Sequence, residues 1–73
     1  SIEVFPNPAR SVLQISIVET TAIEIYTILG QVMFTKENTF NQETIDVSSY
    51  KSGTYFVKIS KGAFTTTKKF TVK

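Results

Sequence analysis

The sequence predicts an all-β fold, a seven-stranded antiparallel β-sandwich. Along most of the chain apolar residues alternate with polar ones, which is the two-residue period of a strand with one buried face. Glycines, prolines and short polar runs interrupt this alternation at the intervals expected for turns between short strands. Seventy-three residues, of which 41% are apolar, are enough for one hydrophobic core. β-branched and aromatic side chains fill the apolar positions, as strands prefer.

The first three predicted strands are Ile2–Phe5, Leu13–Ile17 and Ile23–Ile25. The run Pro6-Asn7-Pro8 must end the first strand, because proline cannot donate to a strand ladder. Thr20-Thr21 is expected to separate the second strand from the third.

The next two predicted strands are Val32–Phe34, with Val32 and Phe34 on one face, and Ile45–Val47. Before them, Leu29-Gly30 stands where the chain must reverse, and glycine adopts the required positive φ at little cost. After them, the polar segment Ser48–Gly53 is expected to be a connection with one helical turn that a serine caps.

The last two predicted strands are Tyr55–Ile59 and Phe64–Val72, joined by a hairpin turn at Lys61-Gly62. In an unbroken final strand, Phe64 and Lys68 would both point to the core side, as Phe70 does. Either a bulge turns this lysine outward, or that end of the sandwich is open and the lysine stem lies on apolar surface with its amine in water.

The composition excludes the common catalytic and metal-binding chemistries. The chain has no cysteine and no histidine, so Ser–His and Cys–His nucleophiles and the usual zinc sites are ruled out. Most of the six acids fall on outward strand positions or at strand ends, without the spacing of a calcium loop. We therefore expect no catalytic residue, no metal and no cofactor. No apolar run is long enough to cross a membrane, so direct membrane insertion is not expected.

Charge is segregated along the chain. All six acids precede Lys51, whereas six of the eight basic residues follow Tyr50. Such asymmetry indicates either a partner surface or lysines that protect exposed sheet edges from aggregation. Nucleic-acid binding is not expected, because the basic residues are sparse and Arg10 is the single arginine.

A series of short motifs runs along essentially the whole chain: Val4-Phe5-Pro6-Asn7-Pro8-Ala9, Leu13-Gln14-Ile15, Ile23-Glu24-Ile25-Tyr26-Thr27-Ile28-Leu29-Gly30-Gln31, Ile45-Asp46-Val47-Ser48, Ser52-Gly53-Thr54-Tyr55-Phe56-Val57-Lys58 and Lys68-Lys69-Phe70-Thr71-Val72-Lys73. In their content and order these motifs resemble the type A C-terminal sorting domain of the type IX secretion system of Bacteroidota. Two residues depart from the family pattern. Thr27 replaces the commoner Asn or Asp, and Tyr50 replaces the commoner Leu.

The resemblance implies an immunoglobulin-like sandwich that works in transport rather than in catalysis. Residues 1–73 would be one C-terminal sorting domain excised from a longer cargo protein, with the cargo N-terminal to it. Its partners would be the type IX translocon, shuttle proteins and a sortase-like signal peptidase that cleaves upstream of Ser1. The domain would pass through the periplasm and reach the cell surface or the extracellular medium.

The resemblance also suggests which residues matter. Those expected to form the sorting signal or contact a partner are Gly53, Thr54, Tyr55, Lys58, Lys68, Lys69, Phe70, Val72 and Lys73. Those expected to shape the fold are Pro6, Asn7, Pro8, Leu29, Gly30 and Asp46. From parity alone, Tyr55, Phe70 and Val72 suit the core, whereas Lys69 and Lys73 face outward. We expect the final hairpin, Gly53–Lys73, to be the recognised element, and deletion of Phe70–Lys73 to stop export while most of the sandwich stays folded.

Two other functions fit a β-sandwich without catalytic residues. An adhesion or carbohydrate-binding module would need exposed aromatic side chains, for which Tyr26 and Phe56 are the candidates. A spacer that holds an enzyme away from the cell surface would tolerate loss of its C-terminal residues.

Overall fold

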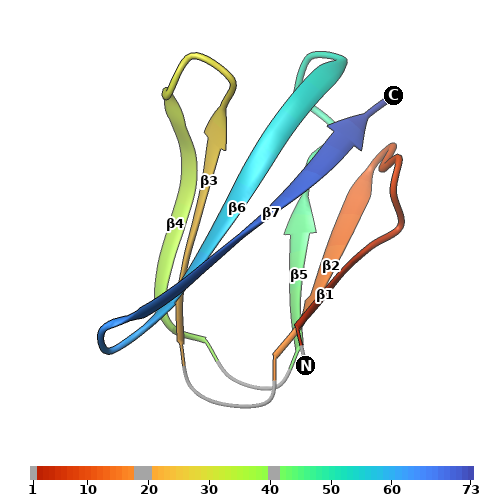
Figure 1. The fold of residues 1–73 in the computed structure, drawn as a ribbon. Coiled ribbons are helices and arrows are strands. Elements are labelled where there is room, and N and C mark those ends of the chain that lie inside the picture. The colour runs from red at the N-terminus through yellow and green to blue at the C-terminus, as the bar shows by residue number, and fades with distance from the viewer. Residues whose placement is uncertain (1, 18–20, 40–41) are drawn as a thin grey trace.

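Two antiparallel sheets form the molecule in the computed structural model, which describes residues 2–17, 21–39 and 42–73 (Figure 1). Within these ranges there are seven strands: β1 (Glu3–Phe5), β2 (Val12–Ser16), β3 (Thr21–Thr27), β4 (Val32–Thr39), β5 (Gln42–Asp46), β6 (Gly53–Lys61) and β7 (Phe64–Val72). The predicted seven-stranded sandwich is therefore confirmed.

The smaller sheet has the order β1-β2-β5 and the larger one the order β4-β3-β6-β7. All the pairings between neighbouring strands are antiparallel. In the constant-type immunoglobulin fold the fourth strand joins the sheet of the first, second and fifth strands. Here β4 instead pairs with β3, so the larger sheet contains both β4 and the C-terminal hairpin β6–β7.

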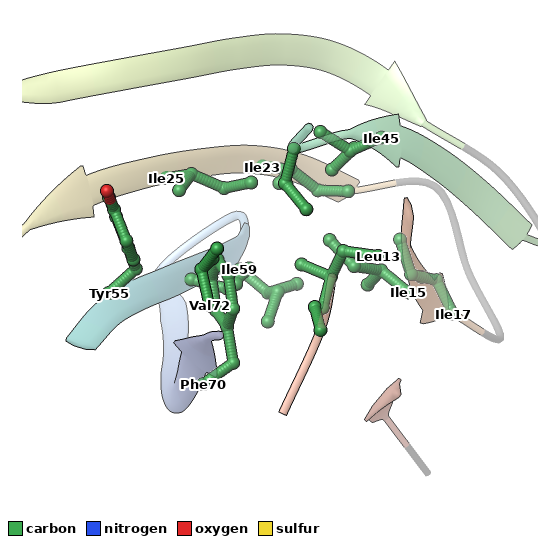
Figure 2. Close-up of a cluster of buried hydrophobic side chains, with 13 residues drawn as sticks. Leu13, Ile15, Ile17, Ile23, Ile25, Ile45, Tyr55, Ile59, Phe70 and Val72 are labelled. Atoms are coloured by element: carbon green, nitrogen blue, oxygen red, sulfur yellow. The ribbon is translucent and has the colours of Figure 1, made fainter. Parts of the chain in front are cut away.

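Thirteen buried apolar residues form the core between the sheets (Figure 2). They come from alternate positions of β2, β3, β5, β6 and β7 and from the segments beside these strands: Ala9, Leu13, Ile15, Ile17, Ile23, Ile25, Ile45, Val47, Tyr55, Val57, Ile59, Phe70 and Val72. Each large side chain among them stabilises the fold by about 1.5–3 kcal/mol through its removal from water. This core matches the alternation from which the fold was predicted.

A bulge separates two side chains that were expected to share a face. Ile25 pairs with Phe34, but the next residue, Tyr26, pairs with Val32, so β4 advances two residues while β3 advances one. Phe34 packs against the core, whereas Val32 is exposed. The expectation of one face was wrong because an extra residue in one strand reverses the alternation.

Two of the predicted connections differ in the structure. Thr21 is the first residue of β3 rather than part of a turn, and its neighbour Thr20 lies outside the described residues. After β5, the chain forms a turn in which the Tyr50 amide donates to the Val47 carbonyl at 3.0 Å. The predicted helical turn is absent from this described segment, and Asp46 rather than a serine accepts a hydrogen bond from the turn's backbone.

The first part of β7 is not covered by the smaller sheet. The β6–β7 hairpin projects past the other elements at one end of the sandwich (Figure 1), and Phe64 is 64% exposed although it was expected to face the core. Pairing with β6 continues without a register shift through Lys68, which is also exposed. The predicted bulge at Lys68 was therefore wrong, and the open end, the other alternative, explains the lysine.

Candidate functional site

The predicted recognition residues occupy both faces of the β6–β7 hairpin. Tyr55, Phe70 and Val72 are buried, and the Tyr55 and Phe70 rings stack with centroids 5.6 Å apart. These side chains are therefore unavailable for direct contact with a partner. Their part of the motif fixes the hairpin against the core.

The lysines of the set lie on the accessible surface of the same hairpin. Lys69 pairs with Phe56 across the strands, and Lys58 pairs with Thr67, so both lysines face away from the core. Lys58 also approaches Glu24 of β3, with its Nζ 3.8 Å from a carboxylate oxygen. Lys68 faces the opposite side of the sheet, where the smaller sheet ends.

Gly53 and Thr54 form the start of this hairpin. Gly53 opens β6 with φ +151°, a conformation that side-chain-bearing residues rarely adopt. It pairs with Val72, and Thr54 pairs with Thr71. Pairing of β6 with the end of β7 thus begins at Gly53.

The motif Pro6-Asn7-Pro8 and the C-terminal motif meet in space, although they lie far apart in the sequence. The Thr71 amide donates to Asn7 Oδ1 at 3.0 Å. The Ala9 amide donates to the Thr71 carbonyl at 2.7 Å, and the Lys73 amide donates to the Ala9 carbonyl at 2.8 Å. Segment 7–9 therefore binds the end of β7 as a short parallel strand, with Ala9 opposite Val72.

The hydroxyl of Tyr55 connects the start of β6 to the loop before it. It donates to the Lys51 carbonyl at 2.6 Å, four residues upstream. A tyrosine near the start of the sixth strand that bonds back to the preceding loop is the tyrosine corner of immunoglobulin-like domains. The ring of Tyr50 packs on Tyr55 with centroids 5.2 Å apart. Partial burial, together with the nearby Tyr55 and Asp46, raises the pKa of Tyr50 above its ordinary value.

Asp46 holds the turn that leads to this corner. Its Oδ1 accepts a hydrogen bond from the Ser48 amide at 2.9 Å. Hydrogen bonds from the Ser48 side chain and backbone lower the pKa of Asp46, because they favour the ionised carboxylate. The carboxylate is exposed, so its role is to shape the turn between β5 and β6.

Thr27 organises the reversal at Leu29-Gly30, and sequence reasoning treated it merely as a departure from the family pattern. Its Oγ1 accepts hydrogen bonds from the amides of Leu29 at 3.2 Å and Gln31 at 3.1 Å. A threonine hydroxyl can thus replace the Asn or Asp oxygen in such a turn. Gly30 has φ +91°, as predicted, and Leu29 is 93% exposed.

The two aromatic candidates for a ligand platform lie together on the outer face of the larger sheet. Tyr26 and Phe56 are cross-strand neighbours, and their rings stack with centroids 5.7 Å apart. Each ring is half-buried, because stacking covers part of the faces that a sugar would contact. Nothing in this arrangement favours a carbohydrate-binding function over its simpler role as a cross-strand pair.

The described residues offer no constellation for metal or membrane chemistry. Within residues 2–17, 21–39 and 42–73, no three acidic, histidine or cysteine side chains are grouped so that they could hold a metal ion. The same ranges contain no helix of the length and apolarity that a membrane crossing requires.

The sequence matches the family described as "Secretion system C-terminal sorting domain" over residues 3–73. The chain belongs to this family. The resemblance seen in the sequence motifs is therefore confirmed, and the match covers all seven strands. A sorting domain of this kind is a non-catalytic module, whatever the activity of the protein that carries it.

Two similar proteins stand beside the family match, one by sequence and one by fold. The chain is 37% identical over 67 residues to the Beta-agarase D of Zobellia galactanivorans, which covers 92% of this chain and 14% of that protein. A solved structure of PorZ, described as an essential bacterial surface component of the type IX secretion system of Porphyromonas gingivalis, has a TM-score of 0.82 at 17% identity. That superposition covers 100% of this chain and 11% of the PorZ chain, and it shows a common fold.

Proposed function

We propose that residues 1–73 are the C-terminal sorting domain of a longer cargo protein and direct that cargo across the outer membrane through the type IX secretion system. The family match over residues 3–73 carries this proposal. The chain spans 14% of the length of its agarase relative, so most of such a protein would be cargo. The cargo would precede Ser1.

In this proposal the domain passes through the periplasm and emerges at the cell surface or in the medium. The translocon and its shuttle proteins would bind the folded sandwich, and a sortase-like peptidase would then cleave upstream of Ser1. The arrangement of the ends supports such a path. The start of β1 and the end of β7 lie at opposite ends of the sandwich (Figure 1), so a cargo on the N-terminal side would not cover the C-terminal end of β7.

Recognition is assigned to the β6–β7 hairpin, with Lys58, Lys68, Lys69 and Lys73 as its accessible side chains. All four are lysines on a hairpin whose strands contain no acid. Accessible side chains of one charge can select a partner of the opposite charge, although these lysines lie on both faces of the hairpin. The buried members of the predicted set would act by holding the hairpin that carries these lysines against the core.

The test is an export assay with a fluorescent protein fused before Ser1 and targeted to the periplasm. Strains of a bacterium with this secretion system would be compared with and without a functional translocon. We expect translocon-dependent fluorescence at the surface or in the medium. A fusion without residues 1–73 is the control, and retention of a folded, full-length fusion in the periplasm would reject the proposal.

A further inference from the structure

The larger sheet has two edge strands, and they differ in regularity. β4 pairs with β3 through two register shifts, and it carries Lys36 and Glu37 near its middle. β7 pairs with β6 over nine consecutive residues with no shift. Long and regular edge strands are templates for pairing with another chain, whereas bulges blunt them. Of the two edges, β7 is therefore the one suited to accept an added strand.

The hydrogen bonds at Thr71 show which backbone groups of β7 point to the free edge. Both the amide and the carbonyl of Thr71 bond to segment 7–9, away from β6. Because successive residues of an antiparallel strand direct these groups to alternate sides, those of Thr65, Thr67 and Lys69 point to the same edge. Within the described part of the chain, no hydrogen bond reaches the backbone groups of these three residues on that side.

The protein itself shows that this edge accepts an extended segment. Segment 7–9 occupies it at Thr71 and Lys73 and runs parallel to β7. Upstream of Asn7 the chain leaves the edge to form β1, which belongs to the other sheet. The stretch from Thr65 to Lys69 therefore continues an edge that is already used for strand pairing.

A groove of about 390 Å³ adjoins this stretch, between β1 and β7. Residues 2–5 form one side, and Lys68 and Lys69 form the other. Among the described residues neither lysine makes an ion pair, and Glu3 is the one acid that lines the groove. Because adjacent residues of a strand point to opposite faces, an incoming strand would need acids at two adjacent positions to meet both lysines.

We propose that the β7 edge from Thr65 to Lys69 is a strand-addition site for an extended segment of a partner protein that carries two adjacent acidic residues. Backbone hydrogen bonds would supply affinity, and the two lysines would select the charge. This inference names a kind of partner for the proposed sorting function. It rests on that function only where it places the partner in the export machinery, because peptide binding at the edge does not depend on export.

Peptide binding tests the site without any export assay. The probe is a short fluorescent peptide in which Val and Thr alternate around two adjacent glutamates, and the control peptide has two lysines instead. We expect the glutamate peptide to bind roughly tenfold more tightly, from two new charge pairs, and to protect the amides of Thr65, Thr67 and Lys69 from hydrogen exchange. Three results would overturn the proposal: equal binding of both peptides, protection of β4 amides from hydrogen exchange instead, or protection of the β7 amides by self-association when no peptide is present.

Variants separate the charges of the edge from its backbone. Lys68→Glu with Lys69→Glu should abolish the preference for glutamate, whereas Lys51→Glu, in the loop before β6, should leave it unchanged. Thr67→Pro removes an amide that faces the free edge and leaves the β6 ladder intact, so it should weaken peptide binding by about tenfold. Thr67→Val keeps the amide and is the matched control.

The same Thr67 variants separate this inference from the proposed function in cells. If wild-type and Thr67→Val fusions are exported and Thr67→Pro is folded but retained, the edge is the docking site. Normal export of Thr67→Pro would overturn the edge inference while leaving the sorting function intact. Retention of the wild-type fusion would reject the sorting function instead, and the peptide assay would still decide the edge.

Discussion

Deletion of Phe70–Lys73 should unfold the domain rather than simply remove a recognition signal. The sequence suggested that most of the sandwich would survive this deletion. In the structure, however, Phe70 and Val72 are 0% and 2% exposed and belong to the core. The deletion also removes the partners of Asn7 and Ala9, so segment 7–9 loses its attachment to β7.

The size of the effect follows from these contacts. Removing two buried apolar side chains costs about 3–6 kcal/mol, and losing the three hydrogen bonds to segment 7–9 costs about 1.5–4.5 kcal/mol more, before the β6–β7 ladder bonds at Phe70 and Val72 are counted. A domain of 73 residues has a free energy of unfolding of roughly 4–11 kcal/mol at about 0.05–0.15 kcal/mol per residue. The loss is therefore comparable to the whole stability.

The assay is urea denaturation of the purified domain, followed by circular dichroism, beside export of the same variants. Deletion of Lys73 alone is the control, since it removes one hydrogen bond, to Ala9, and should cost about 1 kcal/mol. The Phe70–Lys73 deletion should show no cooperative transition. A cooperative transition within about 2 kcal/mol of the parent would refute this reasoning, on the scale of the single buried side chain.

Three further predictions concern residues outside the hairpin. Lys36 Nζ lies 2.9 Å from both carboxylate oxygens of Glu43 on the facing sheet, and the two side chains are 52% and 16% exposed. A double-mutant cycle of Lys36→Met and Glu43→Gln should therefore give a coupling free energy of about 1 kcal/mol that falls in high salt. A coupling near zero would contradict this prediction. Hydrogen bonds lower the pKa of Asp46 in the folded state, so Asp46 stabilises the fold above its unfolded pKa, and this contribution is lost as pH falls through the folded pKa. Asp46→Asn should remove that part of the acid dependence when thermal unfolding is measured between pH 2 and 6. A pH profile that the substitution leaves unchanged would contradict this prediction. Gly30→Ala should lower the free energy of unfolding, measured by urea denaturation, by about 1–2 kcal/mol. The cause is backbone strain alone, because φ is +91° and the added methyl meets nothing within 4 Å. Gly30→Asn should lower the free energy of unfolding less, and equal losses for the two variants would argue against this prediction.

The sequence was sufficient for the fold because its main signal is a period of two. Leu13, Ile15, Ile23 and Ile25 alternate with polar residues and are all buried. The alternation predicts burial wrongly where a bulge interrupts a strand or where the facing sheet does not cover a side chain. The bulge that separates Val32 from Phe34 depends on pairing between strands, which a linear pattern does not contain.

The candidate site was less predictable for a related reason. Parity placed Phe64 inward, but whether an inward side chain is buried depends on how far the facing sheet extends. The attachment of Asn7 to Thr71 joins residues 64 positions apart, so no local spacing reveals it. The family motifs identified both segments as important, but the structure was needed to show that they contact each other.

The attachment of segment 7–9 to the end of β7 has a consequence for biosynthesis. Contacts between residues so far apart in sequence delay folding, because the loop must close before they stabilise the chain. Thr71 lies near the end of β7 and Lys73 follows it, so both are synthesised after the other strands of the domain. A chain that stops before Thr71 cannot complete the sandwich. The sandwich therefore closes only after the whole of the matched segment, residues 3–73, has been synthesised.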